Sequence, residues 1–122
     1  MSEDLTKQHC VPCEGGVAPM TKAAAQERLA EVPGWQLRAD GKEISREFKF
    51  KNFMAALAFI NRIGAMAEAE GHHPDIELGW GRVGVRLSTH AIGGLSLNDF
   101  ILAAKINALA HEQSASPRES KK

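Results

Sequence analysis

The stretch GHHPDIELGWGRVGVRLS, residues 71–88, indicates how this chain folds. Gly71 suits the left-handed position that follows a helix, and Pro74 prevents the helix from continuing. Apolar side chains then alternate with other residues over 75–80 and again over 82–88, which is the period-two pattern of strands. The stretch therefore predicts the end of a helix followed by a β-hairpin.

The chain before this stretch contains a second hairpin pattern. Residues 35–38 are a candidate short strand, Asp40-Gly41 is a turn signal, and residues 44–50 alternate with period two. Asn52 can cap a long helix that ends at Gly71. The central part of the chain therefore reads as two hairpins joined by a helix.

Two further helices are expected outside the hairpins. Thr21 can cap a helix that Pro33-Gly34 ends, and Ser96 starts a last helix that reaches about His111. The order α-β-β-α-β-β-α predicts a two-layer α+β fold, in which three helices cover one face of a four-stranded antiparallel sheet. The other face, open to water or to another subunit, is expected to carry Arg46, Arg82 and Arg86.

Length and composition limit the classes of function. The 122 residues, 43% of them hydrophobic, suit one domain with one core. Lys+Arg and Asp+Glu number 15 each, which gives no basic field for nucleic acid. No apolar run approaches the roughly 20 residues of a membrane span, and the N-terminus does not resemble a secretion signal. We expect a cytoplasmic protein with a flexible arm over 1–20, a domain over 21–111 and a disordered tail over 112–122.

Three histidines and a glutamate lie near the predicted ends of these elements. His72-His73 follows the long helix, His90 follows the second hairpin, and Glu68 lies one turn before the helix end. Imidazoles transfer protons near neutral pH, and a rigid scaffold can present them from its loops. Glu68 can orient His72, four residues later, if the last turn stays helical, or it can be a solvated surface acid.

Other residues of this region have structural explanations beside functional ones. Asp99 has the spacing of a capping box with Ser96, and that role accounts for it. Trp35 and Trp80 can be core residues or aromatic walls for a planar ligand. Three imidazoles can hold zinc, but the adjacent His72-His73 pair is poorly spaced to aim both rings at one ion, so we expect no metal here.

Cys10 and Cys13 form a C-x-x-C in the N-terminal arm. Zinc usually needs four ligands, and the chain has no second such pair. A thioredoxin-like motif needs a helix after the cysteines, where Glu14-Gly15-Gly16 stands instead. We expect two reduced thiols, with a structural zinc shared between subunits as the alternative.

The spacing of seven residues resembles the signature of the pterin-4a-carbinolamine dehydratases. These residues are Glu68, His72, His73, Pro74, Trp80, His90 and Asp99. Four further segments are similar to that family: Pro33-Gly34-Trp35, 48–53, 87–90 and Gly94-Leu95-Ser96. The resemblance extends from about Thr21 to about Ala110.

The resemblance implies dehydration of 4a-hydroxytetrahydropterin to quinonoid dihydropterin and water, in tetrahydropterin recycling, without a metal or organic cofactor. It implies the same helix-covered sheet and assembly into homodimers or homotetramers. His72 and His90 would be the acid and base, and Glu68 would tune or position His72. The residues expected to bind the pterin are His73, Pro74, Trp35, Trp80 and Asp99. Animal members also act as dimerisation cofactors for a homeodomain transcription factor, so a binding module acting on a partner protein is the alternative.

Overall fold

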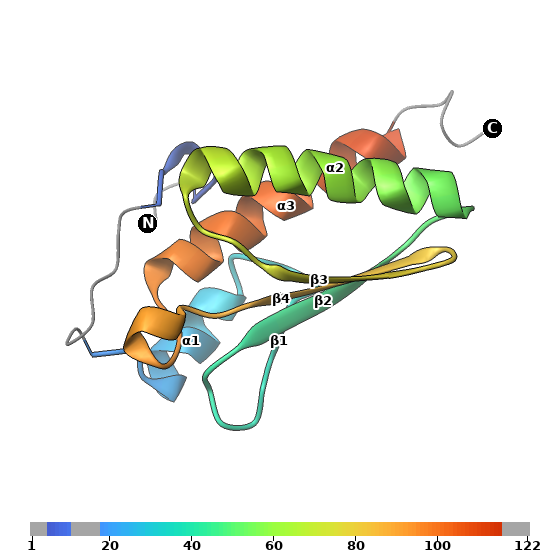
Figure 1. Ribbon diagram of the computed structural model, residues 1–122. Coiled ribbons are helices and arrows are strands. Elements are labelled where there is room, and N and C mark those ends of the chain that lie inside the picture. The colour runs from blue at the N-terminus through green and yellow to red at the C-terminus, as the bar shows by residue number, and fades with distance from the viewer. Residues whose placement is uncertain (1–4, 11–17, 116–122) are drawn as a thin grey trace.

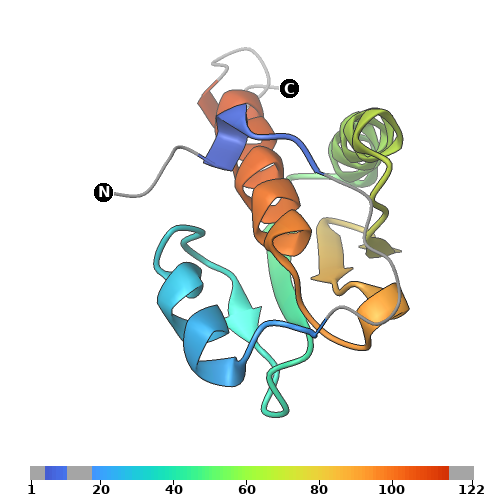
Figure 2. The same cartoon turned by 90° about the vertical axis from the view of Figure 1, so that its left-hand side faces the viewer.

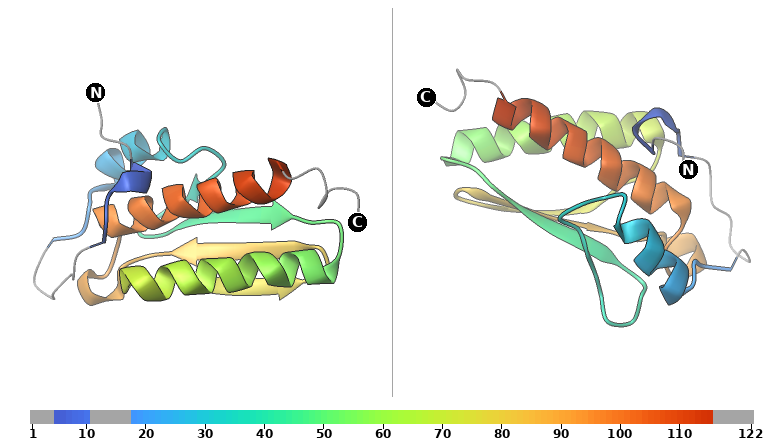
Figure 3. Two further views of the ribbon diagram at one scale, coloured as in Figure 1. Left: turned by 90° about the horizontal axis from the view of Figure 1, so that it is seen from above. Right: turned by 180° about the vertical axis from the view of Figure 1, so that it is seen from behind.

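The structure, a computed structural model, describes residues 5–10 and 18–115 and has the predicted α+β architecture (Figure 1). The elements follow one another as η1 (Leu5–Lys7), α1 (Lys22–Leu29), β1 (Gln36–Leu37), β2 (Ile44–Lys49), α2 (Phe53–Glu70), β3 (Asp75–Gly79), β4 (Arg82–Leu87), η2 (His90–Ile92) and α3 (Leu97–Ala115). The strands form one antiparallel sheet in the order β1-β2-β4-β3. Helices α2 and α3 lie across one face, and α1 packs beside β1 (Figure 3).

Local chemistry explains the starts of α1 and α2 and the end of α2, whereas α1 ends at Leu29, before the expected stop at Pro33-Gly34. The Thr21 hydroxyl accepts the Ala24 amide at 3.1 Å at the start of α1, and the Asn52 side chain accepts the Ala55 amide at 2.8 Å at the start of α2. Each bond satisfies an amide that has no partner inside its helix. Gly71 ends α2 with a φ of 69°, in the left-handed region.

The core lies between the sheet and the two long helices. Helix α2 buries side chains three or four residues apart on its face toward the sheet: Ala56, Phe59, Ile63 and Ala67. Strand β4 lies in the middle of the sheet and buries alternate residues: Val83, Val85 and Leu87. The apolar side chains that recur with helical spacing in α2 and with alternate spacing in β4 therefore pack together in one layer.

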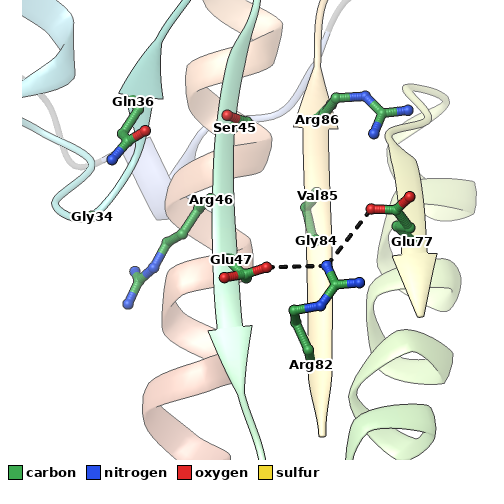
Figure 4. Close-up of a pocket in the computed structure, with 10 residues that line it drawn as sticks. All are labelled: Gly34, Gln36, Ser45, Arg46, Glu47, Glu77, Arg82, Gly84, Val85 and Arg86. Carbon is green, nitrogen blue, oxygen red and sulfur yellow. Dashed lines mark hydrogen bonds and ion pairs between the residues drawn. The ribbon is translucent and has the colours of Figure 1, made fainter. Parts of the chain in front are cut away.

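The opposite face of the sheet is polar (Figure 4). Arg82 Nη1 lies 3.0 Å from Glu47 Oε2 and 3.6 Å from Glu77 Oε1, and Arg86 is exposed on the same strand. These groups surround a hollow of about 420 Å³ above Gly84. Arg82 and Arg86 thus lie on the predicted open face.

The prediction for Arg46 is wrong. Its guanidinium donates to the Asn107 side chain of α3 at 2.8 Å and to the Pro33 carbonyl at 3.1 Å. Arg46 shares the side of β2 that carries Ile44 and Phe48, because alternate strand residues point to the same face. Figure 4 accordingly shows Arg46 directed away from Arg82.

The two terminal regions differ from the expected boundaries. Residues 5–10, called the arm below, lie against α3, and Leu5 is 4% exposed (Figure 2). Helix α3 continues to Ala115, beyond the expected end near His111. Cys13 and most of the expected tail lie outside the described residues. Among the described residues, no helix is long and apolar enough to cross a membrane.

Candidate active site at one end of the sheet

The hairpin of β3 and β4 brings the histidines to one end of the sheet. Asp75 at the start of β3 is paired with Arg86 near the end of β4. His72 precedes β3 by three residues and His90 follows β4 by three residues, so antiparallel pairing places both at the same end. The loop before β3 and the 3-10 turn after β4 therefore present the candidate site.

His72 is held by a buried carboxylate of α3. Its Nε2 lies 2.6 Å from Asp99 Oδ1, and the two side chains are 12% and 0% exposed. A carboxylate only accepts hydrogen bonds, so Nε2 is the donor and Nδ1 is left for proton exchange in the neutral ring. A hydrogen bond to a charged group contributes about 1.5–3 kcal/mol, so this contact fixes the orientation of the His72 ring.

Two hydroxyl groups complete the surroundings of Asp99. Thr89 Oγ1 donates to Asp99 Oδ2 at 2.8 Å and lies 2.8 Å from Ser96 Oγ. A hydroxyl has one proton, so the Ser96 hydroxyl must donate to Thr89. The Ser96 amide also donates to Asp99 Oδ2 at 2.9 Å, which is the bond expected of a capping box. Asp99 therefore has the predicted capping role and a second role, as the partner of His72.

Glu68 pairs with His73, which corrects the expectation that it acts on His72. His73 Nε2 lies 2.9 Å from Glu68 Oε1, and both side chains are largely exposed. The reversal at Gly71 explains the exchange of partners. The His72 amide turns back to the Ala67 carbonyl, so His72 does not continue the helical face that carries Glu68. An exposed pair of this kind contributes about 0–1 kcal/mol, so it does little for the fold.

His90 is exposed at the start of η2, directly after Thr89. Its neighbour Thr89 is buried and bonded to Asp99, and the Thr89 and Gly94 backbones pair with each other. The position of His90 is thus set by a rigid turn while its ring stays open to solvent. Pro74 is half-buried between His73 and the start of β3.

The two tryptophans do not join the histidines within the chain. Trp35 is buried, and its Nε1 donates to Asn107 at 2.7 Å. Asn107 is eight residues beyond Asp99, or about 12 Å along α3. Trp80 is 70% exposed at the hairpin tip, at the opposite end of β3 from His72. Trp35 therefore has the core role that its sequence context allowed.

Sequence reasoning gave no role to Thr89 or to Glu70, which the structure places next to the site. Thr89 lies in the Leu87-Ser88-Thr89-His90 segment, but a hydroxyl does not reveal a partner ten residues away. Glu70 is the last residue of α2 and accepts the Cys10 amide of the arm at 2.8 Å. Among the described residues, no group of three or more His, Cys, Asp or Glu side chains could hold a metal ion.

The fold and this end of the sheet define an α+β protein with a histidine–aspartate pair at the end of its sheet. The sequence profile of the Pterin 4 alpha carbinolamine dehydratase family matches residues 18–109. The chain belongs to this family, as its residue spacing predicted.

Curated relatives and a solved structure agree with this assignment. A protein of Halorhodospira halophila, provisionally named a pterin-4-alpha-carbinolamine dehydratase, is 57% identical over 86% of this chain and 96% of its own length. A protein of Methylococcus capsulatus with the same provisional name is 49% identical over 88% and 95%. The crystal structure of a transcriptional coactivator/pterin dehydratase from Brucella melitensis has a TM-score of 0.72 and 36% identity, covering 75% of this chain and 98% of its own.

Proposed function

We propose that the chain dehydrates a 4a-hydroxytetrahydropterin to the quinonoid dihydropterin and water, with His72 and His90 as the acid and base. The observation that carries this proposal is the 2.6 Å contact between His72 Nε2 and the fully buried Asp99. An imidazole fixed by a buried carboxylate, with a second imidazole at the same end of the sheet, suits a reaction that consists of proton transfers.

The reaction needs one proton to arrive and one to leave. The C4a–O bond breaks as the hydroxyl receives a proton and departs as water, and the N5–H bond gives up its proton while its electron pair forms the C=N bond. We assign the N5 proton to Nδ1 of His72, because Asp99 stabilises the imidazolium that results. We assign protonation of the hydroxyl to His90, whose exposed ring can be reprotonated from water. A proton passing from His72 to His90 through solvent restores the starting state.

His73, Glu68 and Pro74 serve binding in this scheme. The exposed His73–Glu68 pair lies beside the reacting end and offers a donor and a carboxylate to the polar edge of a pterin. Pro74 restricts the backbone of His73 to extended geometry, which keeps that ring apart from His72. Their loss is expected to raise KM more than it lowers kcat.

The test is steady-state dehydration of a synthetic carbinolamine by His72→Ala and His90→Ala. General acid–base catalysis contributes about 100-fold or more, so each variant should lose at least that much in kcat. His111→Ala is the matched control, because His111 is an exposed histidine near the far end of α3. If both variants fold and keep nearly full turnover, the assignment of acid and base is wrong.

A non-catalytic binding module is the second candidate. The Brucella relative is described as a coactivator as well as a dehydratase. Phe53 and Met54, at the start of α2, are 42% and 67% exposed, which gives this helix an apolar surface for a partner protein. A folded parent protein that leaves the carbinolamine unchanged would favour this candidate over the enzyme.

Assembly as a homodimer or homotetramer in the cytoplasm belongs to the same proposal. The strand order leaves β1 and β3 at the edges of the sheet, and an edge strand has unpaired backbone groups that another chain can bind. Light scattering on the purified chain measures the assembly state, and a monomer at all concentrations would contradict this part of the proposal.

A further inference from the structure

The arm, residues 5–10, precedes the segment matched by the family profile but is packed on the domain. Leu5 is 4% exposed and belongs to the core cluster. Lys105 of α3 donates from its Nζ to the Thr6 carbonyl at 3.0 Å. Figure 2 shows this segment, drawn in blue, against α3. The arm is therefore attached at its first turn by an apolar anchor and a hydrogen bond.

The other end of the arm contacts the two helix ends next to His72 and Asp99. The Cys10 amide donates to Glu70 Oε1 at 2.8 Å, and His9 Nδ1 lies 3.0 Å from Glu70 Oε2. Cys10 Sγ lies 3.6 Å from the Asn98 carbonyl. Glu70 precedes His72 by two residues, and Asn98 directly precedes Asp99. The arm thus links the end of α2 to the start of α3, next to the bond between His72 and Asp99.

These contacts stabilise the charged form of Glu70. Its side chain is 9% exposed, at the C-terminus of a helix, where the macrodipole disfavours a carboxylate. Burial by itself raises the pKa of Glu70, but the Cys10 amide, the His9 ring and the Lys105 ammonium at 3.4 Å outweigh it, and the pKa lies below its usual value. The arm and Lys105 therefore stabilise the ionised carboxylate.

We infer that the arm is a positioning element of the active site. Through Glu70 and Asn98 it fixes the spacing between the end of α2 and the start of α3, and so fixes His72 against Asp99. Glu70 and Lys105 are positioning residues, since they act through the loop that carries His72. The kinetic consequence rests on the proposed dehydratase function, whereas the effect on the His72 ring does not.

Two variants of the full chain test this inference. Leu5→Asp removes the apolar anchor and should release the arm. Glu70→Gln keeps the shape of the side chain but removes the charge that faces His9 and Lys105, and it leaves the core unchanged. Glu31→Gln is the matched control: it removes the carboxylate that lies 3.2 Å from Arg28, away from the histidines.

Each test variant should lower kcat by up to about 10-fold with little change in KM, because small misplacements of reacting groups are costly. The pH profile of kcat should change in shape, which a loss of folded protein alone would not produce. Hydrogen exchange at the Cys10 amide reports release of the arm. The NMR signals of the His72 ring report its bond to Asp99, with or without substrate.

Acidification should release the arm in the parent protein. Because the pKa of Glu70 is lower in the folded state, its contribution to docking is complete above the pKa of an unfolded glutamate. The contribution is lost as the pH falls through the lower, folded value. His9 and Lys105, the groups that face Glu70, then lose the negative charge of their partner. The NMR shift of the Cys10 amide followed against pH measures this release, and an unchanged shift through that range would contradict it.

The inference is overturned if the Cys10 amide loses protection while the His72 ring signals and kcat stay at parental values. Circular dichroism shows whether Leu5→Asp is folded. If it is unfolded, the His72 ring signals and the kcat of Glu70→Gln test the inference. If the parent protein has no dehydratase activity, the proposed function fails. A changed His72 signal in the arm variants would still support the inference, and an unchanged one would overturn it.

Discussion

The two ends of the β3–β4 hairpin contain residues of the same sequence signature but differ in structure. At one end, His72, Thr89 and Asp99 are joined by hydrogen bonds of 2.6 and 2.8 Å, and Asp99 is fully buried. At the other end, Trp80 is 70% exposed between two glycines. Residues that belong to one sequence signature therefore lie at separate places within the folded chain. The first end fixes the His72 ring by hydrogen bonds, and the second closes a tight turn.

Asp99→Asn should have the largest effect, because it removes the charge that holds His72. We expect kcat to fall by about 100-fold, since the ring loses its fixed orientation and the partner of its charged form. Steady-state kinetics over pH, with Asp40→Asn as the control at an exposed turn, measures this. Parental kcat in folded Asp99→Asn would remove the reason to place catalysis at this end.

Gly81→Ala should destabilise the fold without affecting the chemistry. A Cβ at Gly81 would lie 2.7 Å from the Phe50 carbonyl oxygen, and the Phe50 amide donates to the Gly81 carbonyl at 2.7 Å. The backbone must shift, so we expect about 1–3 kcal/mol lower free energy of unfolding and unchanged kcat per folded molecule. Gly64→Ala is the matched control, because nothing lies within 4 Å of a Cβ there and alanine favours a helix.

Thr89→Val should produce a smaller catalytic loss than Asp99→Asn. The change keeps the shape but removes the donor to Asp99 Oδ2 and leaves the Ser96 hydroxyl without its acceptor. A net hydrogen bond to a charged group is worth about 1.5 kcal/mol or more, so we expect kcat to fall about 10-fold. Thr89→Ser restores the hydroxyl and should recover most of the activity. If Thr89→Ser is as slow as Thr89→Val, the contacts of the Thr89 methyl group matter for kcat and its hydrogen bonds to Asp99 and Ser96 do not.

Trp80→Ala should have the smallest effect in an isolated chain. Surface substitutions usually change energies by less than about 0.5 kcal/mol, so kcat and KM should stay within about two-fold of the parent values. Steady-state kinetics at several protein concentrations measures both constants. A several-fold rise in KM that depends on protein concentration would show that Trp80 reaches a pterin site of another subunit.

Much of the fold is predictable because its signals are local. Thr21 and Asn52 cap the helices that they were expected to cap, and Gly71 reverses the chain where the pattern indicated. Each of these effects depends on atoms within a few residues. The side of the sheet that carries Arg46 was also predictable from local sequence. Arg46 lies two residues from both Ile44 and Phe48 in β2, and alternate residues of a strand point to the same face.

The partners of the histidines were not predictable in the same way. Glu68 has the helical spacing to reach His72, but Gly71 turns the chain and gives Glu68 to His73. Asp99 is 27 residues from His72 in sequence and meets it only because α3 packs across the same sheet. A pattern of spacing contains no information about such a contact until the elements are assembled.

Local sequence sets the order of helices and strands, the capped starts of α1 and α2, the end of α2 at Gly71 and the family signature. These follow from backbone preferences and side-chain periodicity, which act over one or two turns. Three further features appear only in the assembled fold: which carboxylate holds which histidine, the separation of Trp35 in the core from Trp80 at the far tip, and the packing of the arm beside the site. Those outcomes depend on contacts between distant segments, which exist only once burial of the apolar faces has brought the segments together.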